Sequence, residues 1–285
     1  MIADLPRPIA VVAHDAGAAN MLFAWLEDIP AGDLRVALAG PAERIWQAQF
    51  RESPVLASID DALDGAASLV SGTGWASDME HAARVEAARR GIPSLAVVDH
   101  WVNYAPRFER EGTRQLPDAI LVGDAEAVTI ARETFPGTRI AQLPNLYLQR
   151  QARDAGPVPD DGDILFVMEP ARSTWGHGTT PGEFQALDYF MAHRGGAGIG
   201  EDVAMRLRPH PSDAPGKYDD WIRAQPGATL DTAGDMSEAL GKARWVAGLN
   251  SFALVIALEA GRKAISCLPP WAPACVLPQA GIVRL

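Results

Sequence analysis

The sequence predicts an α/β protein built from two doubly wound parallel-sheet domains that face a cleft. Three observations support this fold class. Short apolar runs alternate with stretches of helical periodicity along the chain. The alternation is interrupted once, by a polar segment that contains proline and glycine, and then starts again. The length of 285 residues suits two compact halves better than one small domain.

Composition excludes several classes of protein. Hydrophobic residues make up 48% of the chain and charged residues 21%, which is enough apolar material for two globular cores. The formal net charge is −11, whereas a general nucleic-acid partner needs a basic footprint. We therefore expect no nucleic-acid partner, and we expect any bound phosphate to be held by a local cluster of donors.

Cysteine usage and apolar runs bear on cofactors and location. The spacing of Cys267 and Cys275 fits neither a zinc site nor a CxxC pair, so we expect no metal. No cofactor signature is found either. The N-terminus lacks the layout of a signal peptide, and the uncharged run 245–258 is too short to span a bilayer. We expect a cytoplasmic protein without an integral membrane segment.

The first half opens with a strand at 8–13, a turn of small residues and then a helix, which is typical of a doubly wound domain. The same alternation then continues to residue 142. Further strands are expected at 34–39, 67–71, 94–98, 119–122 and 139–142, and further helices at 42–51, 58–63, 78–90 and 124–135.

The polar segment 149–163 has no periodicity and is expected to be a linker. It separates an N-terminal, acceptor-binding domain at 1–148 from a C-terminal, donor-binding domain at 164–285. In the second half we expect strands at 164–168, 203–207, 228–230, 244–247 and 263–267, and helices at 182–193, 214–224, 235–243 and 252–260.

Two strand ends in the second half predict a phosphate or nucleotide site. Arg208 and His210 follow one strand, while Asn250 and Ser251 follow another and open a helix. Anionic ligands bind at such edges and at helix N-termini. The alternatives are that His210 is a turn residue, Arg208 a surface cation and Ser251 a plain helix N-cap.

Three further residues are candidates for nucleotide contacts. Arg172 and Ser173 lie in a long glycine-containing loop after the first strand of the second half. Glu259 is the only acid of the apolar helix after Ser251, and it is either a solvated last-turn residue or an acceptor for ribose hydroxyls.

Two pairs in the first half are candidates for catalysis, because a histidine beside a carboxylate can act as a general base. His14-Asp15 and Asp99-His100 each follow a strand. Neighbours on an extended chain point in opposite directions, so neither pair is expected to form a dyad, and one of the four residues is expected to be catalytic. A nearby loop either lines an acceptor site or packs on the surface; its candidates are Trp101, Asn103, Tyr104 and Arg107.

The motif Gly72-Thr73-Gly74, with Ser77 three residues on, is a degraded GxGxxG at an unusual strand. It is weak support for a dinucleotide and we discount it.

On these residues the chain resembles the GT-B superfamily, which contains nucleotide-sugar glycosyltransferases and UDP-N-acetylglucosamine 2-epimerases. His210-Pro211, Asn250-Ser251 and Glu259-Ala260-Gly261 look most like the donor-binding motifs of capsule polysaccharide and CDP-glycerol glycerophosphotransferase-type enzymes. The resemblance implies two Rossmann-like domains, a nucleotide-sugar donor bound without metal and a role in polysaccharide biosynthesis. An acidic-glycine catalytic motif of the polysialyltransferase type is absent, since Asp64-Gly65 is a poor match.

The leading hypothesis is therefore a glycosyltransferase-like enzyme that uses a nucleotide-activated sugar in cell-surface polysaccharide biosynthesis. A nucleotide-sugar epimerase or hydrolase of the same fold is the first alternative. A non-catalytic nucleotide-binding or scaffold protein is the second, because fold alone does not fix function. The acceptor and the oligomeric state are left open.

Overall fold

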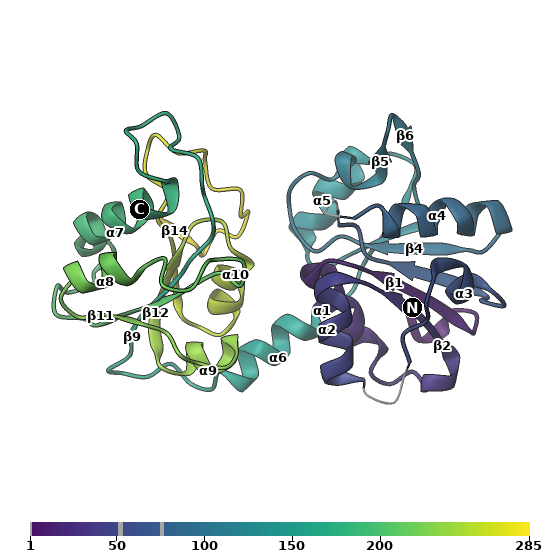
Figure 1. Cartoon of the computed structure of the whole chain (residues 1–285), viewed down its shortest axis with the longest axis horizontal. Coiled ribbons are helices and arrows are strands. Elements are labelled where there is room, and N and C mark those ends of the chain that lie inside the picture. The colour runs from purple at the N-terminus through teal and green to yellow at the C-terminus, as the bar shows by residue number, and fades with distance from the viewer. Residues whose placement is uncertain (1, 51–53, 75–76) are drawn as a thin grey trace. The chain divides into compact units, whose positions relative to one another are not determined.

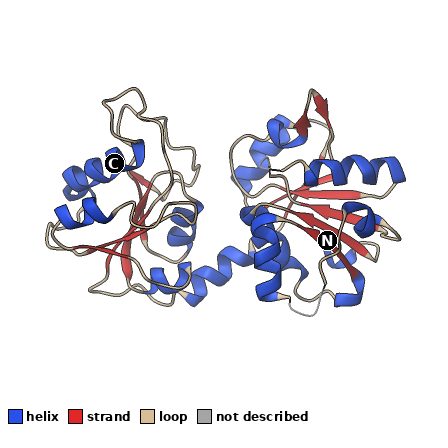
Figure 2. Ribbon diagram, in the orientation of Figure 1, coloured by secondary structure: helices blue, strands red, loops and turns tan. Residues whose placement is uncertain are grey.

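The computed structural model describes residues 2–50, 54–74 and 77–285 (Figure 1). The chain divides into two compact units, Met1–Tyr147 and Leu148–Leu285. In each unit the described residues form a six-stranded parallel sheet with helices packed against it (Figure 2). The prediction of an α/β protein with two doubly wound parallel sheets is confirmed.

The first sheet has the strand order β2-β1-β3-β4-β7-β8, and all of its pairings are parallel. The order reverses between β1 and β3. A single parallel bridge from Val36 to Val55 adds a short extension beyond β2. The strands are β1 (Ile9–Ala13), β2 (Leu34–Leu38), β3 (Ser68–Ser71), β4 (Ser94–Val97), β7 (Ala119–Val122) and β8 (Arg139–Gln142).

Successive side chains of β1 point to opposite faces of the first sheet and contribute to two hydrophobic cores, one on each face. Val11 belongs to a core with Phe23 and Trp46, whose rings pack edge to face at 4.9 Å. Val12 belongs to the core on the other face. Strands buried on both faces are typical of parallel sheets. The helices of this unit are α1 (Ala16–Leu26), α2 (Gly40–Gln49), α3 (Ile59–Leu63), α4 (Met79–Arg90) and α5 (Ala125–Thr134).

Helix boundaries in the first unit follow local capping chemistry. Ser58 Oγ accepts the N–H of Asp61 at 3.0 Å, and Asp124 accepts that of Ala127 at 2.7 Å. Gly91 ends α4 in the left-handed conformation with φ +70°, which favours glycine. The helix predicted at 42–51 ends at Gln49 in the structure, and its predicted last residue lies outside the described residues.

The second sheet has the order β11-β10-β9-β12-β13-β14, again with parallel pairings only. Numbered within the unit this is 3-2-1-4-5-6, the Rossmann order, which reverses between β9 and β12. The strands are β9 (Asp163–Val167), β10 (Met205–Arg208), β11 (Ala228–Leu230), β12 (Ala243–Gly248), β13 (Lys263–Ser266) and β14 (Val283–Arg284).

Helices of the second unit cover the sheet. Phe166 and Phe190 pack edge to face at 5.5 Å in the core between β9 and α7. The helix predicted at 214–224 is wrong in its first part, because Gly216 is left-handed at φ +76° and the helix begins only at Asp219. The helices are α7 (Gly182–His193), α8 (Asp219–Ala224), α9 (Met236–Gly241) and α10 (Phe252–Glu259).

The segment expected to be a linker at 149–163 has defined structure. Its first part is the end of helix α6 (Leu146–Asp154). The buried Arg262 then donates hydrogen bonds to the carbonyls of Ala155 at 3.0 Å and Gly156 at 2.8 Å. These contacts fasten residues 155–157 to the second unit.

The sequence did not predict the hairpin of β5 (Glu109–Arg110) and β6 (Thr113–Arg114), whose turn carries Glu111 and Gly112 at positive φ. Short 3₁₀ helices occur at Ile2–Asp4, Ala31–Asp33, Ala105–Phe108 and Arg194–Ala197. None of the helices within the described residues combines the length and the apolar character needed to cross a membrane.

Candidate functional site

Each unit brings polar residues to the carboxyl edge of its sheet, where the strand order reverses. In the first unit, His14 follows β1, and Thr73 follows β3. In the second, Glu169 follows β9, and Asn250 follows β12. Ligands of open α/β sheets bind at such switch points.

His14 and Asp15 form a hydrogen-bonded pair, which the alternation argument had excluded. His14 Nδ1 lies 2.7 Å from Asp15 Oδ1. The chain leaves β1 at Ala13 and turns into α1, so strand alternation no longer separates the two side chains. Asp15 is the N-cap residue of α1 but makes no side-chain cap, because its carboxylate faces His14 instead. The side chains are 20% and 33% exposed, so the pair is partly exposed, and Nε2 of the ring lies next to Gly40, where an added methyl group would be 2.7 Å away.

Glu80, which the sequence did not predict as a site residue, is hydrogen-bonded to the backbone of His14. It is fully buried on α4, and its Oε1 accepts the backbone N–H of His14 at 3.0 Å. Burial raises the pKa of Glu80, more than the bond from His14 lowers it. A methyl group added at Gly72 would lie 2.2 Å from Oε1, so glycine there makes room for the carboxylate.

Asp99 is held by Arg107 and does not pair with His100. Arg107 Nη1 donates to Asp99 Oδ1 at 2.8 Å and to Thr73 Oγ1 at 3.2 Å. The other Asp99 oxygen approaches the first turn of α1, since a methyl group added at Gly17 would lie 1.8 Å from it. A carboxylate is stabilised at that end of a helix.

His100 accepts the backbone N–H of Trp101 at Nδ1, at 3.0 Å. The Asp99-His100 pair therefore forms no dyad, in agreement with the alternation argument.

The candidate acceptor loop is largely packed inside its own unit. Trp101 and Tyr104 are buried, and Trp101 Nε1 donates to the carboxylate of Asp124 at 3.0 Å. Burial raises the pKa of Tyr104. Arg107 is buried behind Asp99, whereas Asn103 is exposed and left-handed at φ +60°. Of this group, Asn103 offers its side chain to solvent, and a role in acceptor binding stays a prediction.

In the second unit, Glu169 connects the end of β9 to the turn after β12. Its Oε2 accepts the backbone N–H of Asn250 at 2.9 Å. Burial raises the pKa of Glu169, while the nearby His210 acts to lower it. Glu169 lies in the loop identified from the sequence, but it was not chosen as a site residue. It is hydrogen-bonded to the backbone of Asn250 and lies near His210.

The loop of His210 is anchored by the buried carboxylate of Asp213. Asp213 accepts the backbone N–H of His210 at 3.0 Å, the Tyr218 hydroxyl at 2.8 Å and Lys217 Nζ at 2.7 Å. His210 itself is exposed. Its Nδ1 accepts the N–H of Ser212 at 3.1 Å, and no partner is found for Nε2 in the described part of the chain. Nε2 is thus available to a ligand.

Arg208 is already paired. Its Nη1 donates to Asp231 Oδ2 at 2.5 Å and to the Ala233 carbonyl at 3.0 Å. Arg206 binds the other oxygen of Asp231 and also Asp163. The Asp231 side chain is 1% exposed and is shared by the two guanidinium groups, and Asp163 supplies the second negative charge of this network. Arg208 reaches the expected edge as one member of an ion-pair network.

The side chains of Ser251 and Asn250 accept hydrogen bonds from the protein's own backbone. Ser251 Oγ accepts the N–H of Ala253 at 3.2 Å, which is the N-cap of α10 that the alternative reading predicted. Asn250 Oδ1 accepts the N–H of Val276 at 2.9 Å. Glu259 is exposed at the opposite end of the eight-residue helix α10, about 12 Å along its axis from Ser251.

The loop after β9 supplies an unpaired cation. Arg172 is exposed and has no ion pair with any residue that the structure describes. Ser173 Oγ accepts the N–H of Trp175 at 3.1 Å. Gln185 Nε2 holds the loop through the carbonyls of Thr174 and His177, each at 2.9 Å. Within residues 2–50, 54–74 and 77–285, no group of three or more His, Cys, Asp or Glu side chains is arranged to hold a metal ion.

Comparisons with known proteins find solved structures of a similar fold. No protein-family model and no curated protein sequence matches the chain. Solved structures do match. A putative UDP-N-acetylglucosamine 2-epimerase from Listeria monocytogenes has a TM-score of 0.61 at 14% identity, covering 92% of this chain and 79% of the other.

Two further solved structures have a similar fold. UDP-GlcNAc 2-epimerase from Neisseria meningitidis, bound to UDP-GlcNAc, has a TM-score of 0.57 at 11% identity, with coverage of 90% and 82%. The glycotransferase of kitacinnamycin has a TM-score of 0.51 at 13% identity, with coverage of 98% and 86%. The chain is therefore a two-domain α/β protein with Rossmann-like sheets. It shares this two-domain fold with the epimerase and glycotransferase structures, in agreement with the fold that the resemblance to GT-B proteins predicted.

Proposed function

We propose that this protein is an enzyme that transfers a glycosyl group from a nucleotide-activated sugar to an acceptor hydroxyl in cell-surface polysaccharide synthesis. The observation that carries the catalytic part is the pairing of His14 Nδ1 with Asp15 Oδ1 at 2.7 Å. The GT-B fold supports a nucleotide-sugar substrate by analogy. A cytoplasmic location stays a prediction.

The His14-Asp15 pair has the arrangement of a general base and its orienting acid. Asp15 accepts the Nδ1 proton, so the lone pair of the neutral ring is at Nε2. From there His14 would take the proton of the acceptor hydroxyl as the new glycosidic bond forms. The charge of Asp15 stabilises the imidazolium that results. Glu80 fixes the backbone of His14 and thereby the position of the ring.

The donor's phosphates would bind at the carboxyl edge of the second sheet. His210 Nε2 and the exposed Arg172 are cationic or hydrogen-bonding groups without protein partners in the described residues. The N-terminus of α10 adds the positive end of a helix dipole. UDP is the first nucleotide to test, since similar structures contain UDP-GlcNAc and UDP.

Epimerisation or hydrolysis of the nucleotide sugar is a second candidate function. It is favoured by the partly exposed carboxylates of Asp15 and Asp99 near one sheet edge, because chemistry on the sugar ring needs acids and bases. It predicts turnover without an acceptor. A non-catalytic nucleotide-binding or scaffold protein predicts binding without turnover.

The test follows UDP-GlcNAc by NMR, first alone and then with mono- and disaccharide acceptors. His14→Gln is expected to lower kcat about 100-fold or more and to leave the Kd for UDP unchanged, because a general base acts in the chemical step. Asp15→Asn should lower kcat without changing UDP binding. Product without acceptor identifies an epimerase or hydrolase. Full turnover by the His14→Gln enzyme contradicts the proposed base.

A further inference from the structure

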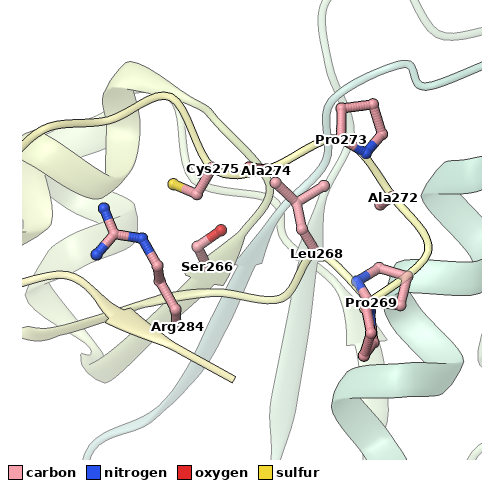
Figure 3. A pocket seen from close by; sticks show the side chains of 9 residues that line it. Ser266, Leu268, Pro269, Ala272, Pro273, Ala274, Cys275 and Arg284 are labelled. Carbon is pink, nitrogen blue, oxygen red and sulfur yellow. The ribbon is translucent and has the colours of Figure 1, made fainter.

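A cavity of about 290 Å³ opens at the carboxyl ends of β13 and β14, beneath the loop 268–275 (Figure 3). As Figure 3 shows, Arg284 and Cys275 lie on one side of it, and Pro269 and Pro273 lie on the other. Its volume corresponds to roughly ten water molecules, which is room for one sugar ring.

The lining combines apolar walls with a single charge. Prolines, alanines and Leu268 make up the walls, and Arg284 is the charged residue among the described residues that line the cavity. Arg284 Nη2 donates to the Leu277 carbonyl at 3.0 Å. No carboxylate pairs with Arg284 in the part of the chain that the structure describes, so its other N–H groups can bind a ligand. In a chain with a net charge of −11, such an acid-free wall favours an anion.

Two hydrogen bonds join the cavity to the candidate phosphate site. Ser266 Oγ, in the lining, donates to the Leu249 carbonyl at 2.8 Å. The N–H of Val276, next to the lining residue Cys275, donates to Asn250 Oδ1 at 2.9 Å. The turn at 249–250 opens directly into α10. A group linked to phosphates at the start of α10 therefore lies beside the cavity.

We infer that this cavity binds an anionic sugar, with Arg284 pairing with the carboxylate or phosphate substituent. Guanidinium groups bind both anions through paired N–H donors, while proline and alanine walls cover the ring. Arg284 is then a specificity-determining residue for the donor. The inference rests on the proposed function, because it takes the sugar to be linked to a nucleotide bound at α10.

The first experiment compares UDP-glucuronate with UDP-glucose, which differ only in a carboxylate in place of a hydroxymethyl group. By calorimetry the wild-type protein should bind UDP-glucuronate about tenfold more tightly, an ordinary effect for a charge-assisted pair. Arg284→Gln should abolish this preference and leave UDP binding unchanged. Arg223→Gln is the matched control, because Arg223 is exposed in the same unit and its one ion pair among the described residues is with the exposed Asp220.

The second experiment measures ligand binding in the cavity in the absence of a nucleotide. Cys275 lines the cavity and is partly exposed, whereas Cys267 is buried, so iodoacetamide should react at Cys275. Glucuronate or glucose 6-phosphate at millimolar concentration should slow this reaction at least threefold, and glucose should not. The better of the two acids identifies the substituent. In Arg284→Gln protein neither acid should protect Cys275.

Equal affinity for the two UDP-sugars, together with equal Cys275 reactivity in glucose and in both acids, would overturn the inference and leave the proposed function intact. Protection of Cys275 by an acid in a protein that binds no UDP would support the cavity and count against the proposed function. The two failures are thus distinguishable.

Discussion

The carboxylate of Glu169 accepts the backbone N–H of Asn250 at 2.9 Å, across the point where the strand order of the second sheet reverses. The residue thus occupies the edge at which phosphates are expected, close to His210. An ionised carboxylate would repel a phosphate there. Burial raises the pKa of Glu169 and so favours its neutral form.

Glu169→Gln should therefore bind UDP about three- to tenfold more tightly than the wild type at pH 8, because the amide keeps the acceptor for Asn250 and removes the charge. The gain should shrink as the pH falls, since the wild-type carboxyl then becomes protonated. Calorimetry at a series of pH values from 8 down towards the ordinary glutamate value of 4.5 measures this effect. Glu259→Gln, at the far end of α10, should leave affinity unchanged. Weaker UDP binding by Glu169→Gln would instead make Glu169 a direct ligand of the nucleotide.

Glu80 is expected to make the free energy of unfolding depend on pH. Its pKa is raised in the folded protein above the ordinary value of 4.5, so its stabilising contribution is complete below pH 4.5 and is lost as the pH rises through the folded-state pKa. Glu80→Gln removes this dependence. Melting curves should show the wild type losing stability relative to Glu80→Gln as the pH rises from 4.5 to 8. A constant difference in Tm over that range contradicts a raised pKa at Glu80.

Asp231 is expected to be a major determinant of stability in the second unit. Asp231→Ala leaves Arg206 and Arg208 without their shared carboxylate, and breaking a buried ion pair in this way costs about 3–5 kcal/mol. Asp220→Ala removes the carboxylate of an exposed pair and should change stability little. Urea denaturation measures both. Similar effects for the two variants would show that the Asp231 network contributes no more than a surface pair.

Replacing Gly17 by alanine tests whether the close contact between Asp99 and α1 is required. An alanine methyl group would lie 1.8 Å from Asp99 Oδ2, so Gly17→Ala must displace the carboxylate or the helix. We expect a destabilisation of about 1–3 kcal/mol, typical of overpacking, and lower turnover. Gly32→Ala is the control, because its methyl group meets no atom within 4 Å. Wild-type stability and turnover in Gly17→Ala would remove Asp99 from the site.

The strands and helices could be predicted because their signals are local. Apolar runs give β1, β7 and β12, and capping residues such as Ser58 and Gly91 give helix ends. The same logic found residues at strand ends, such as His14 and His210. The hairpin of β5 and β6 was missed, because two strands of two residues each are too short to show a period.

The supporting acids could not be predicted, because their roles depend on contacts between distant segments. Glu80 reaches the N–H of His14, 66 positions away, and Glu169 reaches that of Asn250, 81 positions away. A partial signal exists in the glycines. Gly72 and Gly74, discounted as a dinucleotide motif, make room for the carboxylates of Glu80 and Asp15 respectively. Of the motif's next residues, 75 and 76 lie outside the described residues.

Thermal shift with UDP, CDP, CMP, GDP and TDP measures whether the second unit binds the nucleotide of an activated sugar. One nucleotide, present at 100 times its Kd, should stabilise the wild type by about 2.7 kcal/mol. His210→Ala should lose that shift, and Ser251→Ala should lose part of it relative to its own unliganded Tm. His193→Ala, an exposed histidine at the end of α7, should keep it. If no nucleotide raises the Tm of the wild type, or if His210→Ala retains the full shift, the second unit does not bind a nucleotide through His210.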